Sequence, residues 1–207
     1  MTLPTRRDAS VDANPLRALT AWIEEARRSG VKEPEAMALA TVDAEGAPSV
    51  RMVLCRGIDE GSLVFFTNYD SRKGRDLAAN PRASAVFHWE ALRRQVRVEG
   101  AVERVTAQES DAYFRARARG SQLAASVSPQ SEPIESLDWL EGRRRALEQA
   151  LSGREVPRPA RWGGYRLRAR AAELWVAGEN RLHWRVRFER EDGGATGRWG
   201  TGRLLGP

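Results

Sequence analysis

Residues 37–57, "MALATVDAEGAPSVRMVLCRG", decide the fold. Apolar and polar side chains alternate along MALATVD and again along SVRMVLCRG, which is the period of a strand with one buried face. The segment between them contains Gly46 and Pro48, and both residue types favour turns. The stretch therefore predicts an antiparallel β-hairpin.

The same alternation returns on the C-terminal side of this hairpin. It runs through SLVFFTN (62–68), ASAVFHWE (83–90) and RRQVRVEGAVERV (93–105), and later through WGGYRLRAR (162–170), AAELWVAG (171–178) and RLHWRVRFER (181–190). Tight turns join the earlier strands, which favours a barrel over a sheet between two helical layers. A last hairpin is expected to turn at EDGG, residues 191–194. The predicted class is mainly β with flanking helices (α+β).

Two helices are predicted beside the first strands. Asn14 and Pro15 supply an N-cap and a first-turn proline for a helix that ends at Gly30. Its apolar residues recur at helical spacing: Leu16, Leu19, Trp22, Ile23 and Ala26. In TNYDSRKGRDLAANPRAS (67–84), Asp70 or Ser71 caps a short helix that ends at Asn80-Pro81.

Two more helices are predicted between the strand groups. The capping box of Thr106 and Glu109 opens one of them, and Gly120 is expected to stop it. SQLAASVSPQSEPI (121–134) then follows as a polar loop, and ESLDWLEGRRRALEQALSG (135–153) as a long helix.

The length and composition of the chain limit the classes of protein to which it can belong. The chain has 207 residues, of which 30% are charged, and a formal net charge of +6. This length suits one domain, placed at residues 14–207 after a flexible arm at residues 1–13. We expect a cytoplasmic protein without membrane binding, since no apolar run could span a bilayer. One cysteine and two histidines predict no metal site, and scattered arginines argue against nucleic-acid binding.

Arg72 and Lys73 stand at the start of the helix in residues 67–84, an unusual place for cations. Free N–H groups and the helix macrodipole already make the potential positive there. A phosphate at this position would be bound by the N–H groups, the dipole and both side chains together. Alternatively both cations are solvated, at a cost of about 0.3–1 kcal/mol each at most.

Two further groups suggest a site. Tyr113 and Arg117 share a face if their helix continues, with Ser121 one turn further, which suits a second phosphate or a solvated basic face. On the strand at 181–190, His183 alternates with Arg181 and Arg185. An imidazole between two guanidinium groups resists protonation, which suits a neutral hydrogen-bonding role, although a lone strand histidine is more often structural.

Six segments together resemble the pyridoxamine 5′-phosphate oxidase family in order and spacing. They are RMVLCR, FFTNYDSRKGRDLAANPRAS, RRQVRVEG, YFRARARGSQLAASVSPQS, RWGGYRL and ELWVAGENRLHWRVRF, and the resemblance covers about residues 14–207. It implies a split β-barrel homodimer that binds FMN at the subunit interface. It also implies oxidation of pyridoxamine or pyridoxine 5′-phosphate to pyridoxal 5′-phosphate, with O₂ reduced to H₂O₂.

The resemblance also implies the roles of individual residues. The positions that fall where the family contacts FMN are Arg51, Met52, Val53, Leu54, Cys55, Arg56, Phe66, Thr67, Arg72, Lys73, Gln95, Gln130, Ser131, Trp175 and Arg185. The positions that fall on the substrate are Arg56, Tyr113, Arg117, Ser121, Arg181, Leu182 and His183, with Arg181 and His183 as the catalytic pair. Arg72 and Lys73 resemble the ligands of the flavin phosphate.

Three departures from the family pattern leave the substrate open. Arg56 stands where a lysine is usual, and Phe66 where a tyrosine is common. Trp184 stands where an Asp is often found, so this position supplies no acidic partner for the neighbouring cations. The arm at residues 1–13 also lacks the usual lid segment. The alternatives are an FMN-dependent oxidase of a reduced aromatic intermediate, like those of phenazine biosynthesis, and a non-catalytic flavin- or nucleic-acid-binding protein. The paired phosphate positions favour the pyridoxamine interpretation.

Overall fold

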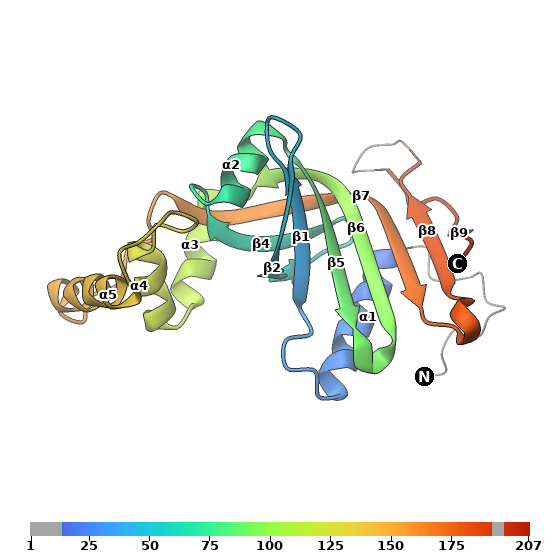
Figure 1. Ribbon diagram of the computed structural model, residues 1–207, viewed down its shortest axis with the longest axis horizontal. Coiled ribbons are helices and arrows are strands. Elements are labelled where there is room, and N and C mark those ends of the chain that lie inside the picture. Colours follow the sequence, from blue (N-terminus) through green and yellow to red (C-terminus); the bar gives the residue numbers. More distant parts are fainter. Residues whose placement is uncertain (1–13, 192–196) are drawn as a thin grey trace.

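The structure is a computed structural model that describes residues 14–191 and 197–207. The predicted arm and most of the predicted EDGG turn lie outside these residues. The described part forms an antiparallel sheet that curls into a half-barrel (Figure 1), with strand order β2-β1-β5-β6-β7-β4-β3, while β8 pairs with β7 and β9 with β8. The strands are β1 (Ala36–Val42), β2 (Pro48–Leu54), β3 (Gly57–Ile58), β4 (Ser62–Asn68), β5 (Arg82–Trp89), β6 (Arg94–Arg104), β7 (Trp162–Val176), β8 (Trp184–Glu189) and β9 (Arg203–Leu204).

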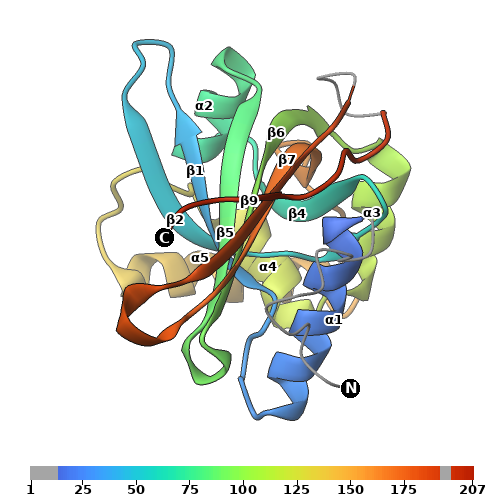
Figure 2. The same ribbon diagram turned by 90° about the vertical axis from the view of Figure 1, so that its right-hand side faces the viewer.

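Five α-helices in the described residues flank this sheet. They are α1 (Pro15–Arg28), α2 (Arg72–Ala79), α3 (Ala107–Ala116), α4 (Arg119–Val127) and α5 (Leu137–Leu151), with short 3₁₀ turns at η1 (Glu90–Leu92) and η2 (Glu179–Arg181). Figure 1 shows α3, α4 and α5 gathered on one side of the molecule and β8 on the other, and the turned view in Figure 2 agrees. None of the helices in the described residues is long and apolar enough to cross a membrane.

The predicted hairpin is confirmed. β1 and β2 pair in antiparallel register from Ala36↔Leu54 to Val42↔Pro48. The period of two gives β1 a fully buried face that includes Met37 and Leu39. β2 is the edge strand of the sheet, and its Val50 and Met52 side chains are 68% and 63% exposed. One face of the hairpin thus builds the core, while its edge strand leaves apolar side chains on the surface.

The predicted first helix is confirmed as α1. The Asn14 side chain accepts a hydrogen bond from the Leu16 N–H at 3.0 Å, and Pro15 stands at the first helical position. All five apolar residues predicted to face the core are buried, where they join strand residues such as Phe65 and Phe87. Burial of this stripe fixes α1 to the sheet.

The helix predictions after residue 106 were partly wrong. The capping box is present, but α3 ends at Ala116 and α4 begins at Arg119, so Gly120 lies inside a helix and much of the predicted loop at 121–134 is helical. The backbone of Arg117 is extended, with ψ of 150°. The Gln122 side chain donates to the carbonyl groups of Phe114 and Arg115, at 2.9 and 3.2 Å. A side chain from the next helix therefore caps the end of α3.

The strand predictions near the C-terminus also need correction. The runs predicted at 162–170 and 171–178 form one strand, β7, because no turn residue separates them. β6 stays paired with β7 through a register shift at Gly100, where a Cβ atom would stand 1.8 Å from the Arg168 carbonyl oxygen. β8 begins only at Trp184, since Asn180 and Arg181 have positive φ angles. The predicted alternation of Arg181 and His183 along a strand is therefore wrong.

Candidate functional site

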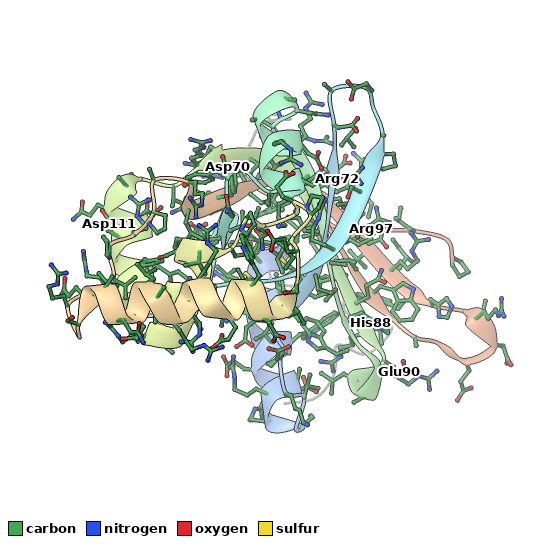
Figure 3. The ribbon with its side chains drawn as sticks, turned by 60° about the vertical axis from the view of Figure 1, so that its left-hand side comes forward. Asp70, Arg72, His88, Glu90, Arg97 and Asp111 are labelled. Carbon is green, nitrogen blue, oxygen red and sulfur yellow. The ribbon has the colours of Figure 1, made fainter. Side chains whose placement is uncertain are left out.

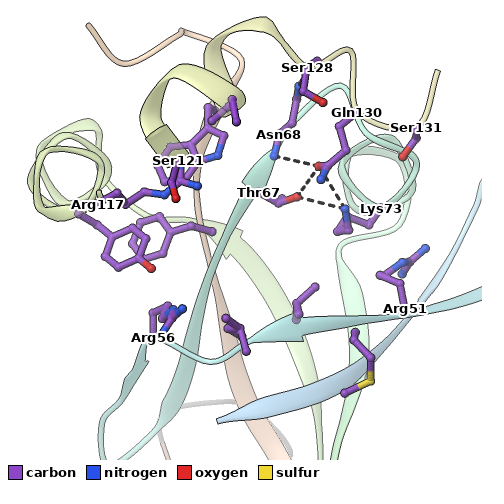
Figure 4. Close-up of a pocket in the computed structure, with 18 of the residues that line it drawn as sticks. Arg51, Arg56, Thr67, Asn68, Lys73, Arg117, Ser121, Ser128, Gln130 and Ser131 are labelled. Atoms are coloured by element: carbon purple, nitrogen blue, oxygen red, sulfur yellow. Dashed lines mark hydrogen bonds between the residues drawn. The ribbon is translucent and has the colours of Figure 1, made fainter. Parts of the chain in front are cut away.

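A pocket of about 1040 Å³ lies between β2, β4, α2, α3 and α4. Fourteen of the predicted site residues line it: Arg51, Met52, Val53, Leu54, Arg56, Phe66, Thr67, Arg72, Lys73, Tyr113, Arg117, Ser121, Gln130 and Ser131. Five of these are cations, and no described residue that lines the pocket carries a carboxylate. Figure 4 shows Arg51 and Lys73 on one side and Arg56 and Arg117 on the other. The pocket is thus suited to anions at two places.

Lys73 is the most constrained cation of the pocket. It is only 6% exposed, and its Nζ donates to Thr67 Oγ1 at 3.1 Å, Ser71 Oγ at 3.3 Å and Gln130 Oε1 at 3.3 Å. Among the described residues it has no carboxylate partner within salt-bridge distance. Burial, and then the charge of Arg51, lower the pKa of Lys73 to about 8. A bound anion would offset this unfavourable burial.

Gln130 joins three elements beside Lys73. Its side-chain oxygen accepts from the Thr67 hydroxyl at 3.0 Å and from the Asn68 N–H at 3.4 Å, as well as from Lys73 (Figure 4). The segment after α4 is thereby tied to the end of β4 and to α2. This position of Gln130, far from Lys73 in sequence, closes one wall of the pocket.

The start of α2 is arranged as the sequence predicted. Ser71 is the N-cap, and its hydroxyl accepts from the Gly74 N–H at 3.4 Å. The first turn contains no acidic residue. Arg72 lies between α2 and the β1–β2 hairpin (Figure 3), and no hydrogen bond or ion pair of its side chain occurs within the described chain. N–H groups, helix dipole and two cations thus converge on one side of the pocket.

The other side of the pocket combines Arg117 with aromatic rings. The guanidinium of Arg117 lies 4.7 Å from the Trp162 ring centre, and its Nη1 is buried without a hydrogen-bond partner in the described residues. Burial lowers the pKa of Arg117, and nearby Arg56 lowers it further. Tyr113 stacks on Phe66 with 3.9 Å between ring centres. Ser121 faces the same space from α4 rather than from the helix of Tyr113.

Trp162 is a pocket residue that the sequence reasoning missed. Its ring is nearly parallel to those of Phe66 and Tyr113. Gly164, two residues further along β7, leaves room for the Phe66 ring, because a Cβ there would stand 2.7 Å from that ring and 2.6 Å from Val105. The signal in the sequence was the WGGY segment, but its two glycines do not reveal which ring they accommodate.

Cys55 does not line the pocket, in contrast to its neighbours in sequence. It follows the end of β2, its side chain is buried in the core, and its Sγ donates to the Gly57 carbonyl oxygen at 3.3 Å. Burial raises the pKa of the Cys55 thiol to about 11. No cluster of His, Cys, Asp and Glu side chains in the part of the chain that the structure describes could hold a metal ion.

The remaining predicted residues form a separate group, which we name the β8-side cluster: Gln95, Trp175, Arg181, Leu182, His183 and Arg185. Gln95, Trp175 and Arg185 are direct cross-strand neighbours on β6, β7 and β8. The His183 ring lies 4.7 Å from the Trp175 ring, between centres. His183 Nδ1 accepts from the Gly178 N–H at 3.2 Å, so a neutral His183 carries its proton on Nε2.

The acidic partner that the sequence analysis found missing near Trp184 is supplied by β7. Glu173 is 3% exposed, and its two carboxylate oxygens lie 3.1–3.2 Å from the Arg185 side-chain nitrogens. Arg97 approaches the same carboxylate at 3.9 Å. The cation therefore has a carboxylate from the neighbouring strand rather than from its own.

The β8-side cluster lies far from the pocket. Phe66 of the pocket pairs with Gly164 of β7, and Arg185 pairs with Trp175, eleven residues further along the same strand. At about 3.3 Å per residue, this separation is on the order of 35 Å. Figure 1 shows α3 and α4, which line the pocket, on the opposite side of the molecule from β8. Along β7, the Arg185 end of the cluster is therefore remote from the Phe66 side of the pocket.

Solved structures match this architecture. PhzG from Burkholderia lata 383, in complex with tetrahydrophenazine-1-carboxylic acid, superposes with a TM-score of 0.90 and 30% identity, over 100% of this chain and 98% of that one. A pyridoxamine 5′-phosphate oxidase-related, FMN-binding protein from Nostoc punctiforme has a TM-score of 0.75 and 20% identity, over 93% of this chain and 98% of that one, a likeness of fold.

Sequence comparisons give closer relatives. The model described as pyridoxamine 5′-phosphate oxidase matches residues 23–149, and that of the pyridoxine 5′-phosphate oxidase C-terminal dimerisation region matches residues 162–205. Pyridoxine/pyridoxamine 5′-phosphate oxidase of Rubrobacter xylanophilus is 52% identical, over 88% of this chain and 84% of its own length. The protein of the same name from Deinococcus deserti is 48% identical, over 96% of this chain and 92% of its own length. The chain therefore belongs to the pyridoxamine 5′-phosphate oxidase family.

Proposed function

We propose that this protein is an FMN-dependent oxidase that converts pyridoxamine and pyridoxine 5′-phosphate to pyridoxal 5′-phosphate. The observation that carries the proposal is the pocket with cations on two opposite sides and no carboxylate among its described lining residues. Such a pocket suits two phosphorylated molecules bound side by side, a cofactor and a substrate. The names of the relatives at about half identity support the same activity.

The residues on the Lys73 side fit the phosphate of FMN. Lys73 is buried without a carboxylate partner, and Arg72 has no partner for its charge in the described chain. A phosphate dianion among Lys73, Arg72, Arg51 and the α2 N-terminus would be attracted by all four positive groups. When bound, FMN supplies the acceptor for a hydride from the substrate carbon, and O₂ then takes the electrons to give H₂O₂.

The residues on the Arg117 side fit the substrate phosphate. Arg56, Tyr113, Arg117 and Ser121 all line the pocket, and the buried Nη1 of Arg117 has no hydrogen-bond partner in the described residues. Two guanidinium groups provide a planar, fixed set of donors that suits phosphate oxygens. This side therefore selects phosphorylated over unphosphorylated substrates and fixes the distance of the reacting carbon from the cofactor.

We infer that the site is completed by a second copy of the chain, in a homodimer. Along β7, Arg185 and its neighbours are remote from the Phe66 side of their own pocket, which favours a contact with the pocket of a second chain. The match to a dimerisation region at 162–205 includes Trp175, His183 and Arg185. Exposed apolar side chains lie on both regions, Val50 and Met52 at the pocket and Leu182 and Leu204 near the cluster. Association would cover them.

His183 and Arg181 act on the substrate in this arrangement. Because Gly178 donates to Nδ1, a neutral His183 offers the Nε2–H as a hydrogen-bond donor to the substrate. The Trp175 ring and the Gly178 hydrogen bond fix the orientation of the imidazole. His183 therefore orients and polarises the substrate, and the hydride acceptor is the cofactor.

An anaerobic half-reaction tests the proposal. The protein is loaded with FMN, desalted and mixed with pyridoxamine 5′-phosphate without oxygen. We expect the absorbance of bound flavin to bleach and pyridoxal 5′-phosphate to form. Flavin that elutes free during desalting would contradict the assigned cofactor.

The second candidate function is oxidation of a reduced aromatic compound, favoured by the similarity to PhzG with its bound tetrahydrophenazine-1-carboxylic acid. This candidate predicts flavin that stays oxidised with pyridoxamine 5′-phosphate and bleaches with a reduced tricyclic acid. The relatives of about half identity favour the vitamin B6 substrates.

A further inference from the structure

Asp76 is a buried carboxylate directly behind the pocket. It lies on α2, is 4% exposed, and is not one of the residues that line the cavity. Its Oδ2 accepts a hydrogen bond from the Thr41 hydroxyl at 2.5 Å, and Thr41 on β1 is fully buried. A buried charge is costly unless it is paired, so a specific partner is needed to account for Asp76.

That partner is Arg51. Asp76 Oδ2 lies 3.6 Å from Arg51 Nη2, and the Thr41 hydroxyl links the two, because Arg51 Nη1 donates to Thr41 Oγ1 at 2.7 Å. Arg51 Nη1 also donates to the Leu39 carbonyl oxygen at 3.1 Å, and Nη2 to Ser49 Oγ at 2.7 Å. These contacts set the orientation of the guanidinium group that lines the pocket.

Asp76 also affects Lys73. Burial and Arg51 lower the pKa of Lys73 to about 8, and the charge of Asp76 opposes them. Arg72 lines the same pocket, and the other groups around the Lys73 ammonium, Thr67, Ser71 and Gln130, are uncharged. Of the described charges that act on Lys73, Asp76 is thus the one that favours its protonated form.

We propose that Asp76 is a positioning residue of the phosphate site: it orients Arg51 through Thr41 and supplies the negative charge that lets Arg51 and Lys73 lie side by side. Asp76 does so from behind, without occupying the place of the ligand. The inference rests on the proposed binding of the FMN phosphate at Arg51, Arg72 and Lys73.

The test compares FMN with riboflavin, which lacks the phosphate. Dissociation constants are measured from flavin fluorescence quenching for the unmodified chain, Asp76→Asn and Asp70→Asn. Asp70 is a matched control, since it lies just before α2, is exposed and has no side-chain partner in the described chain. For Asp76→Asn we expect an FMN dissociation constant about tenfold to a hundredfold higher, with riboflavin binding unchanged. Asp70→Asn should change neither.

Two further readouts separate positioning from general stability. In Asp76→Asn, the loss of FMN affinity at alkaline pH should begin at lower pH, because Lys73 loses its proton more easily; Asp76→Glu should restore part of the FMN affinity. If Asp76→Asn does not fold, Thr41→Val removes the bridging hydroxyl and should weaken FMN binding severalfold while riboflavin binding is kept.

The outcomes distinguish this inference from the proposed function. Equal FMN affinity in Asp76→Asn and the unmodified chain, or an equal loss for FMN and riboflavin, would overturn the role of Asp76. If Thr41→Val is the variant that folds, the same two results in that variant would overturn it. Failure of the unmodified chain to bind FMN would instead overturn the proposed function.

Discussion

Lys73 is buried beside Arg51 without a carboxylate partner among the described lining residues, so its protonation should control the proposed binding of the FMN phosphate. Its pKa is lowered to about 8 in the chain without ligand, and a bound phosphate dianion raises it. The bound state thus holds more protons than the free state as pH rises through 8. By linkage, FMN affinity must fall above that pH.

We expect the FMN dissociation constant to be constant between about pH 7 and 7.5 and to rise by up to about tenfold per pH unit above 8. Fluorescence titrations across this range measure it. Lys73→Met should bind FMN weakly with little pH dependence, because the titrating group is gone. A steep alkaline loss that persists in Lys73→Met would show that another group titrates.

Arg117 has a buried N–H group without a partner in the described chain, and a substrate phosphate would satisfy it. We expect Arg117→Ala to raise the KM for pyridoxamine 5′-phosphate about tenfold to a hundredfold, since it removes charge-assisted hydrogen bonds to phosphate. The FMN dissociation constant should stay the same. Arg115→Ala is the matched control, because Arg115 is an exposed cation two residues before Arg117, at the end of α3. An unchanged KM in Arg117→Ala would remove this residue from the substrate site.

Among the secondary-structure elements, local patterns predicted those that depend on local signals. The hairpin of β1 and β2, the Asn14 cap of α1 and the Ser71 cap of α2 follow from alternation and from side chains within a few residues. The break between α3 and α4 does not, because it depends on Gln122, which caps α3 from the next helix. Leu123 and Val127 are buried and four residues apart, a spacing that is typical of a helix. The surrounding serines and proline nevertheless led to the prediction of a loop at residues 121–134.

The pairing of β4 with β7 brings glycine into contact with the aromatic rings of the pocket. Gly164→Ala should displace the Phe66 ring and the Val105 side chain, which a Cβ would approach to 2.7 and 2.6 Å. We expect a loss of about 1–3 kcal/mol in the free energy of unfolding, measured by urea denaturation, together with weaker substrate binding. Gly142→Ala makes the same chemical change in α5, where a Cβ meets nothing within 4 Å, and should be neutral or stabilising. Equal stability of the two variants would contradict the tight contact.

Over the whole molecule, the sequence predicted fourteen residues that line one pocket, but not that the others lie in a separate group of the same chain. The family resemblance placed Lys73 and Arg185 on one cofactor, and the structure puts Lys73 in the pocket on α2 and Arg185 in the separate β8-side cluster. Spacing along the sequence does not reveal the long β7 strand, which pairs with β6 along most of its length, with β4 at its start and with β8 at its end. A site shared between two chains accommodates both the resemblance and the separation.

This shared site can be tested by complementation. Lys73→Ala damages the pocket, and Arg185→Ala damages the β8-side cluster, so each variant alone should bind FMN poorly. In a mixed dimer, the intact pocket of the Arg185→Ala chain faces the intact cluster of the Lys73→Ala chain, while the other site carries both defects. Random pairing of equal amounts makes half of the dimers mixed, so about one quarter of all sites should regain activity.

The measurement is FMN-dependent oxidation after the two variants are coexpressed, compared with the same variants purified separately. Arg115→Ala coexpressed with Lys73→Ala is a control, because each Arg115→Ala pocket is functional with either partner and each Lys73→Ala pocket is damaged, so coexpression should give no more activity than the sum of the separate variants. Recovery only in the Lys73→Ala and Arg185→Ala mixture, above the sum of the separate variants, requires that pocket and cluster act across the interface. Activity that never exceeds that sum would mean that each chain forms its site alone, and the separation along β7 would then have to close by a movement of the chain.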